Sequence, residues 1–115
     1  EAGPSPGSSW RHARYPSLHL HDPVWYQHMP YMEFPKTWPV FTPKDKLADW
    51  MDSYATLMDL NLHTNTKVVK ATEESDGGKT KAWQIETISK NENEGQDGER
   101  STFRARHNVF ATGSS

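Results

Sequence analysis

The chain has 115 residues, of which 33% are hydrophobic and 24% are charged, and its formal net charge is -2. It has no basic stripe, so nucleic-acid binding is not expected, and without cysteine it has neither disulfides nor thiolate chemistry. No apolar run approaches the roughly 20 residues that a membrane-spanning helix needs. The cytoplasm is therefore the default expectation for its location.

The N-terminal part of the chain, residues 1–41, is rich in proline and aromatic residues. All 8 prolines lie within the first 43 residues, together with most of the aromatic side chains. This part shows neither the period of a helix nor that of a strand. It is too apolar for a disordered linker, because such linkers normally lack aromatic residues. We expect a long loop that packs against a surface, which the rest of the chain can hardly supply.

Residues 42–61 carry the clearest signals of a helix. Thr42 is a suitable N-cap, Pro43 suits the first helical position, and Asp45 follows three residues after the cap. Asn61 is the expected stop. Apolar residues recur at the spacing of one helix face, namely Leu47, Trp50, Met51, Tyr54, Leu57 and Met58.

Residues 62–106 predict a three-stranded antiparallel β-meander. A pair of valines indicates the first strand, and Asp76-Gly77-Gly78 is a hairpin turn signal. Apolar and polar residues alternate around Trp83 and again around Phe103, which predicts the second and third strands. The acidic stretch 91–99 between them predicts a solvated turn.

Residues 107–113 predict a final buried strand. The apolar run from Val109 leads into Thr112 and Gly113, where glycine permits a tight turn. Buried strands of this kind belong to parallel sheets, which need neighbouring strands and crossover connections. The chain supplies neither before this strand, so we expect the chain to be an interior piece of a larger protein.

The order of these pieces resembles one protein family. The series consists of Glu1, then Gly7-Ser8-Ser9-Trp10-Arg11, then Tyr15-Pro16-Ser17-Leu18, the Thr-Pro helix start, the meander and Ala111-Thr112-Gly113. It resembles the flavin-containing monooxygenases, in particular the branch related to Baeyer–Villiger and auxin-forming enzymes. The similarity covers nearly the whole chain; each piece alone is weak, whereas the ordered set is specific.

This resemblance implies an α/β fold. The chain would be a fragment of a Rossmann-like flavoprotein with two dinucleotide-binding domains, and residues 1–115 would form part of the FAD-binding domain. Within it, residues 1–41 would be a cofactor-facing loop. The long helix, the meander and the final buried strand would follow in that order.

The resemblance also implies a function, that of an FAD- and NADPH-dependent monooxygenase. Such an enzyme uses O2 to insert one oxygen atom into a small organic substrate through a peroxyflavin, by N- or S-oxygenation or by Baeyer–Villiger chemistry. Catalysis there resides mainly in the flavin, so no catalytic residue is expected in this segment. The chain holds no Gly-x-Gly-x-x-Gly motif; in the family these phosphate-binding motifs lie before Glu1 and after Gly113. The fragment alone is expected to be inactive.

Cofactor contacts follow from the same resemblance. Glu1 would hold the FAD ribose hydroxyls, and Trp10 and Arg11 would lie along the cofactor. His21 would stand near the flavin ring and the nicotinamide, where the family usually has Asn or Asp. The backbone of Val68 would contact the adenine. The small residues of the last turn would let the backbone approach the dinucleotide, and these are Ala111, Thr112 and Gly113.

Other interpretations stay open at this point. Other FAD/NAD(P)H oxidoreductases of the disulfide-reductase-like fold share the meander and the Ala-Thr-Gly turn, but they generally lack the Trp-Arg and Tyr-Pro-x-Leu segments. The aromatic, proline-rich half could instead belong to a protein-binding module without enzymatic activity. His19 and His21 form a His-x-His pair, but a metal site needs further ligands, and we predict none.

Overall fold

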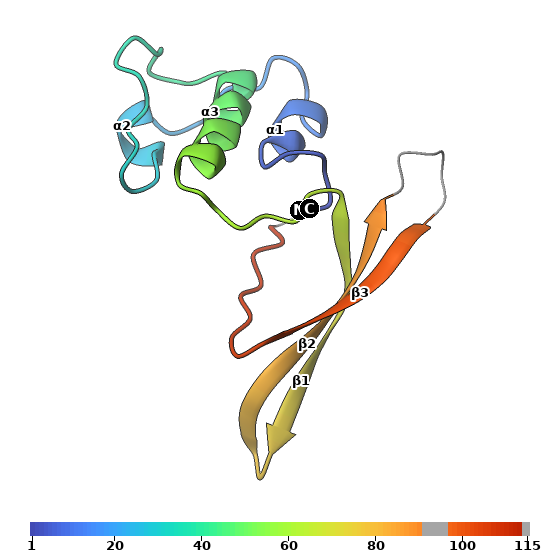
Figure 1. Cartoon of the computed structure of the whole chain (residues 1–115). Helices are drawn as coiled ribbons and strands as arrows, with labels where there is room; N and C mark the ends of the chain where they lie inside the picture. The colour runs from blue at the N-terminus through green and yellow to red at the C-terminus, as the bar shows by residue number, and fades with distance from the viewer. Residues whose placement is uncertain (91–96, 114–115) are drawn as a thin grey trace. The chain divides into compact units, whose positions relative to one another are not determined.

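The computed structural model describes residues 1–90 and 97–113, and the chain divides into two compact units. Unit 1 comprises Glu1 and residues 3–64, and unit 2 comprises Ala2 and residues 65–115. Unit 1 contains helices α1 (Ser8–His12), α2 (Val24–Gln27) and α3 (Lys44–Leu57) (Figure 1). Unit 2 contains strands β1 (Thr66–Asp76), β2 (Lys79–Lys90) and β3 (Asp97–Ala105). The predicted α/β composition is confirmed. Among the described residues, no helix is both long and apolar enough to cross a membrane.

Helix α3 is the predicted long helix, but it is shorter than the expected 42–61. Pro43 has extended backbone at the N-cap position, so the helix begins at Lys44. The side chain of Thr42 is fully buried, and its hydroxyl has no hydrogen-bond partner in the described part of the chain. The predicted Thr42 cap is therefore wrong. The physical reason is that the Thr42 carbonyl accepts the N–H of Leu20 at 2.8 Å, which holds Thr42 in extended pairing.

The C-terminal end of α3 is a Schellman motif. The N–H of Asp59 donates to the Thr56 carbonyl at 3.3 Å, and the N–H of Leu60 donates to the Ala55 carbonyl at 3.0 Å. Asp59 adopts a φ of 51°, a left-handed conformation that Asp tolerates better than most residues. The predicted stop at Asn61 is therefore wrong, because Asp59 already ends the helix.

The core of unit 1 forms between α3 and the aromatic segment that precedes it. Trp50 is 4% exposed, and its ring meets that of Phe34 edge-on with centroids 4.8 Å apart. Phe34 also stacks on Trp38 at 4.8 Å, and Leu20 and Leu47 complete the buried cluster. Part of the aromatic segment thus finds its packing surface inside the chain, contrary to the expectation from sequence.

The single long loop predicted over residues 1–41 is not observed. These residues contain the short helices α1 and α2, which flank α3 on opposite sides (Figure 1). They also pair with the segment that enters α3. The N–H of Lys44 donates to the Leu18 carbonyl at 3.0 Å, and the N–H of Val24 donates to the Val40 carbonyl at 2.9 Å. This pairing satisfies backbone groups that regular secondary structure would otherwise have to satisfy.

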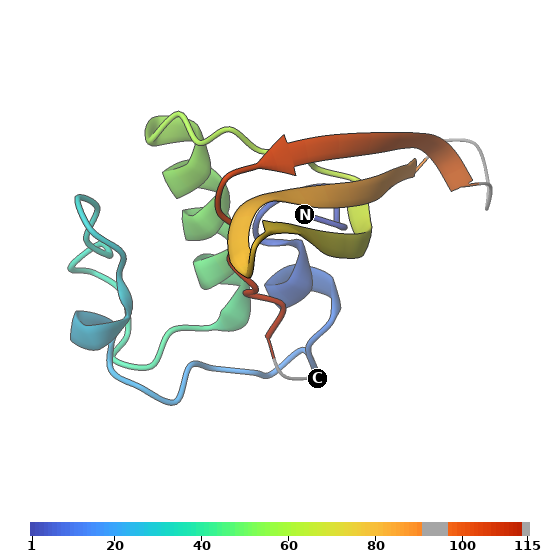
Figure 2. The same ribbon diagram turned by 90° about the horizontal axis from the view of Figure 1, so that it is seen from below.

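Unit 2 is the predicted meander, with antiparallel pairs in the order β1-β2-β3 (Figure 2). Gly77 and Gly78 connect β1 to β2 with φ values of 57° and 81°. Two positive φ values are what a two-residue type I′ hairpin requires, so the turn prediction is confirmed. Ile85 lies opposite both Ala71 and Phe103, and these three residues share one face of the sheet.

The predicted buried strand over 107–113 is not observed. These residues form no strand, and Val109 and Phe110 are 84% and 67% exposed. A strand needs a neighbour for its backbone hydrogen bonds, whereas the three described strands pair only with one another. Of the predicted acidic turn at 91–99, residues 91–96 lie outside the described residues and the remainder belongs to β3.

The two leucines of α3 give a direct test of which helix face is buried. Leu47 is 7% exposed, whereas Leu57, predicted on the same apolar face, is 67% exposed. We expect Leu47→Ala to destabilise unit 1 by about 2–4 kcal/mol, because it leaves a cavity in the core. Leu57→Ala should change the stability by less than about 0.5 kcal/mol. Amide hydrogen exchange across α3 measures both, and equal effects would contradict the assigned face.

Substitutions at Thr42 distinguish a buried hydroxyl from a helix cap. Thr42→Val replaces an unpaired buried hydroxyl by a methyl group, so the free energy of unfolding should stay constant or rise by up to about 1 kcal/mol. Thr42→Ser removes a buried methyl group and should cost about 1 kcal/mol. A capping hydroxyl would give the opposite order, since serine caps helices and valine does not. Exchange rates of the first α3 amides decide between the two orders.

Candidate functional site

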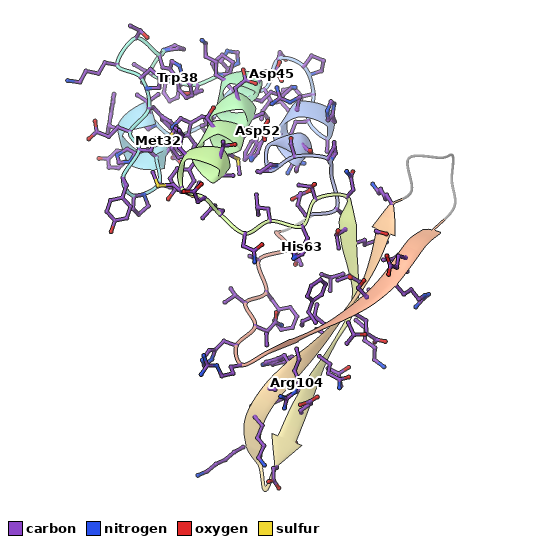
Figure 3. The ribbon with its side chains drawn as sticks, in the orientation of Figure 1. Met32, Trp38, Asp45, Asp52, His63 and Arg104 are labelled. Atoms are coloured by element: carbon purple, nitrogen blue, oxygen red, sulfur yellow. The ribbon has the colours of Figure 1, made fainter. Side chains whose placement is uncertain are left out.

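Helix α1 lies against α3 through a close backbone contact. A Cβ atom on Gly7 would stand 2.4 Å from the carbonyl oxygen of Ala48, so a larger residue does not fit there. The N–H of Gly7 donates to Asp52 Oδ1 at 2.8 Å, and Asp52 lies on the side of α3 that faces α1 (Figure 3). This contact fixes α1, and with it Trp10 and Arg11, relative to α3.

Arg11 reaches from α1 to two carboxylates on α3. Its Nη1 lies 2.8 Å from Asp49 Oδ1, and its Nη2 lies 2.8 Å from Asp52 Oδ2. The hydrogen bonds to these carboxylates raise the pKa of Arg11 above its ordinary value, and the bond to Asp49 has the larger effect. The guanidinium is thus engaged within the protein, and the predicted contact of Arg11 with a cofactor stays a prediction.

Lys44 ties the end of α1 to the start of α3. Its side chain is buried, and a buried ammonium group is stable only with partners. Nζ donates to the Arg11 carbonyl at 2.9 Å and to Asp45 Oδ1 at 2.7 Å. The bond from Lys44 lowers the pKa of the Asp45 carboxyl below its ordinary value. The stabilisation by Asp45 is therefore complete above its ordinary pKa and is lost as the pH falls through the lowered value.

A hollow of about 330 Å³ lies beside Trp10. It combines an apolar wall with imidazole, guanidinium, carboxylate and amide groups. Its lining residues are Trp10, Arg14, Leu18, His19, Leu20, His21, Asp22 and Gln27. Three further hollows of 310, 360 and 340 Å³ contain none of the predicted site residues. The structure thus brings Trp10 and His21 to one hollow, which we call the Trp10 hollow.

Polar contacts order part of this lining. The guanidinium carbon of Arg14 lies 5.5 Å from the centre of the Trp10 ring, a cation–π arrangement. Gln27 Nε2 donates to Asp22 Oδ2 at 2.8 Å. Reasoning from the sequence missed Arg14 and Gln27. Arg14 lies beyond the end of α1 at His12, so no helical spacing in the sequence indicates its position beside Trp10.

The other predicted site residues lie elsewhere. Glu1 is exposed, and its Oε1 accepts the N–H of Gly3 at 2.8 Å. In unit 2, Val68 is 56% exposed on β1. Among the described strands β1 pairs with β2 alone, so about half of its backbone groups point away from the sheet. Residues 111–113 are exposed, and Gly113 has a φ of 76°.

Comparison with known proteins gives the family. No protein-family model matches the chain. The chain is 33% identical over 85 residues to the probable indole-3-pyruvate monooxygenase YUCCA8 of Arabidopsis thaliana, a match that covers 74% of the chain and 19% of that protein. For the probable indole-3-pyruvate monooxygenase YUCCA9 of the same plant, the identity is 31% over 106 residues, a match that covers 92% of the chain and 23% of that protein. The uncharacterized CzcO-like oxidoreductase of Geobacillus kaustophilus is 34% identical over 70 residues, covering 61% and 20%.

These matches confirm the resemblance found in the sequence: the chain is a distant relative of the flavin-containing monooxygenases. Its similarity extends to proteins named as indole-3-pyruvate monooxygenases of plants. The family implies a flavin as the cofactor. The chain spans about a fifth of the length of these curated relatives.

Arg11 and Arg14 form a matched pair for testing which arginine supports the fold. Arg11→Met removes two ion pairs that are partly exposed, so we expect a loss of about 1 kcal/mol in the stability of unit 1. Arg14→Met removes the contact with the Trp10 ring and an exposed hydrogen bond to the Ala13 carbonyl, and it should cost less than about 0.5 kcal/mol. Hydrogen exchange of the α1 and α3 amides provides the measurement. A larger loss for Arg14→Met than for Arg11→Met would contradict the described pairing.

Proposed function

We propose that the chain is a segment of an FAD- and NADPH-dependent monooxygenase and that the Trp10 hollow faces the flavin. The parent enzyme uses O2 to insert one oxygen atom into a small organic substrate, at a soft heteroatom or beside a ketone, and it works in the cytoplasm. The observation that supports this proposal is that Trp10 and His21, both assigned to cofactor contacts by the resemblance, line one hollow. The similarity to a probable indole-3-pyruvate monooxygenase over 92% of the chain supports the monooxygenase part of the proposal.

The residues present fit one part of the cofactor. A hollow of about 330 Å³ with an apolar wall and polar groups suits a single ring system. The pyrophosphate of FAD would need a glycine-rich turn, and the chain holds no Gly-x-Gly-x-x-Gly motif. Bound FAD supplies the redox chemistry, namely hydride acceptance from NADPH and the activation of O2.

In this proposal the chain's own residues bind and orient the cofactor. The Trp10 indole packs along it and excludes water, and the His21 imidazole donates or accepts a hydrogen bond at its polar edge. Arg11 acts as a positioning residue, because its ion pairs hold the helix that carries Trp10. Glu1 has one carboxylate oxygen bonded to Gly3, which leaves the other oxygen for the ribose hydroxyls.

Unit 2 contributes through its backbone in the same proposal. Val68 lies on the edge strand β1, where backbone groups that point away from β2 can meet the adenine. Residues 111–113 are small and exposed, so a dinucleotide can approach their backbone closely. The Rossmann-like arrangement of two dinucleotide-binding domains in the parent belongs to the proposal as well.

The test uses the product of the full reading frame that contains this segment. It should purify with FAD and oxidise NADPH, and label from ¹⁸O2 should appear in an organic product. A purified protein without flavin would contradict the proposal and favour a binding module. Flavin-dependent NADPH oxidation that never transfers label would instead indicate another oxidoreductase of the same fold.

Glu1 gives the sharpest single-residue test of the cofactor assignment. A hydrogen bond to a charged group contributes roughly 1.5–3 kcal/mol. Glu1→Ala should therefore raise the dissociation constant of FAD by about tenfold to a hundredfold, without changing substrate selectivity. Glu33→Ala removes another exposed carboxylate of unit 1 and serves as the control. Titration of apoprotein with FAD measures the constant, and an unchanged value in Glu1→Ala removes Glu1 from the cofactor site.

A further inference from the structure

The aromatic core of unit 1 contains a tryptophan and a tyrosine in direct ring contact. The rings of Trp50 and Tyr54 are stacked, with centroids 5.1 Å apart and an angle of 26° between their planes. Both residues belong to α3, at a spacing that brings side chains together on a helix. Trp50 also meets Phe34 edge-on at 4.8 Å. Because phenylalanine is much harder to oxidise than tyrosine, Tyr54 is the better electron donor of the two neighbours.

The surroundings of Trp50 do not stabilise this ring in an oxidised state. Loss of one electron turns an indole into a radical cation, which ordinarily becomes neutral by releasing its N–H proton. Trp50 is 4% exposed, and its Nε1 has no hydrogen-bond partner among the described residues. The proton therefore has no acceptor, and a buried charge without a partner is costly. An oxidised Trp50 is thus a strong oxidant towards the ring stacked on it.

Tyr54 can release a proton, whereas Trp50 cannot. Its side chain is partly exposed, and its hydroxyl donates to the Pro30 carbonyl at 3.2 Å in a bond that lies at the surface. A phenol that has lost an electron is strongly acidic and passes its proton to water. A tyrosine with this outlet is easier to oxidise at neutral pH than a tryptophan. Electron transfer from the Tyr54 ring to an oxidised Trp50 ring is therefore favourable.

We propose that Tyr54 is a redox-active residue that returns an electron to oxidised Trp50 and so protects the aromatic core of unit 1. In the first step, a one-electron oxidant removes an electron from the Trp50 ring. In the second step, Tyr54 supplies one electron to that ring and its phenol proton leaves to water. Trp50 is then intact, and Tyr54 is a neutral phenoxyl radical. A thiol in solution restores Tyr54 by giving it one hydrogen atom.

The packing of the core explains why this protection has a consequence for the fold. Oxygen that adds to an oxidised indole would introduce polar groups into the contact of Trp50 with Phe34, where they would be buried without partners. Two methionines, Met32 and Met51, pack against the same buried cluster. Their thioethers are competing electron donors, because methionine is readily oxidised to the sulfoxide. A test must therefore distinguish the methionines from Tyr54.

The experiment oxidises the tryptophans of the 115-residue chain and identifies the products residue by residue. Light that only tryptophan absorbs excites the indoles, and a cobalt(III) ammine complex in solution accepts the electron irreversibly. Peptide mass spectrometry then measures oxidised products at Trp50, oxidised or cross-linked products at Tyr54, and sulfoxide at the methionines. In the unmodified chain we expect the Tyr54 products to exceed those of Trp50.

Two tyrosine variants assign the effect to Tyr54. Tyr54→Phe keeps a stacked ring but removes the phenol O–H, so the yield of oxidised Trp50 should rise several-fold. Tyr26→Phe is the matched control, because Tyr26 is 78% exposed and its ring lies beside that of Trp25, with centroids 6.3 Å apart. This variant should leave the yield at Trp50 unchanged. Unchanged amide shifts in the first turns of α3 show that each variant is folded.

Three results would overturn the inference. The first is an equal yield of oxidised Trp50 in Tyr54→Phe and in the unmodified chain, including no product in either. The second is sulfoxide at Met32 or Met51 in place of a Tyr54 product, since a thioether would then supply the electron. The third is an equal rise in Tyr26→Phe. The experiment contains no flavin, so its outcome is independent of the proposed function.

Discussion

The burial of Trp50 against Phe34 is the interaction on which the rest of unit 1 depends. The two rings meet edge-on at 4.8 Å, and Trp50 also stacks on Tyr54 at 5.1 Å. Large aromatic side chains dominate the energy of a small core. The indole N–H of Trp50 has no hydrogen-bond partner among the described residues, so ring packing must also offset the cost of burying that group. Without this contact the proline-rich segment would have no surface on which to order.

The same core supports the candidate site. Trp10 packs against the buried cluster and also lines the hollow, so it connects the two. The helix that carries Trp10 is held on α3 by the Gly7 contact, by Arg11 and by Lys44. A binding residue on a short helix is positioned well only when such supporting contacts fix it. The ion pairs of Arg11 therefore serve the site even though its guanidinium points to α3.

The sequence predicts those features of the fold that local chemistry determines. Helix α3, strand β2 and the Gly77-Gly78 turn are set by neighbouring residues, and all three elements are observed, although Leu57 of the predicted apolar face is exposed. The ends of α3 were misplaced because the pairing of Thr42 with Leu20 and the left-handed Asp59 outweigh the cap signals. The strand over 107–113 was wrong because a strand depends on a partner, which no local pattern reveals.

The site was predictable only in part. The family resemblance placed Trp10 along the cofactor and His21 near the flavin ring, and the structure brings both to one hollow. Which arginine would line that hollow could not be read from the sequence. The carboxylates that engage Arg11 lie 38 and 41 positions further along the chain, and only the docking of α1 on α3 brings them together. Arg14 lines the hollow, whereas that docking engages Arg11.

The central claim, that the Trp10 hollow faces the flavin, is tested most directly by the fluorescence of bound FAD in the full-length protein. An indole in contact with a flavin ring quenches its emission. The account predicts that Trp10→Leu increases the fluorescence lifetime of the bound flavin. Trp25→Leu, which removes a 59% exposed tryptophan of unit 1 that does not line the hollow, should leave it unchanged. Equal lifetimes in Trp10→Leu and the unmodified protein, at full flavin occupancy, would contradict the account.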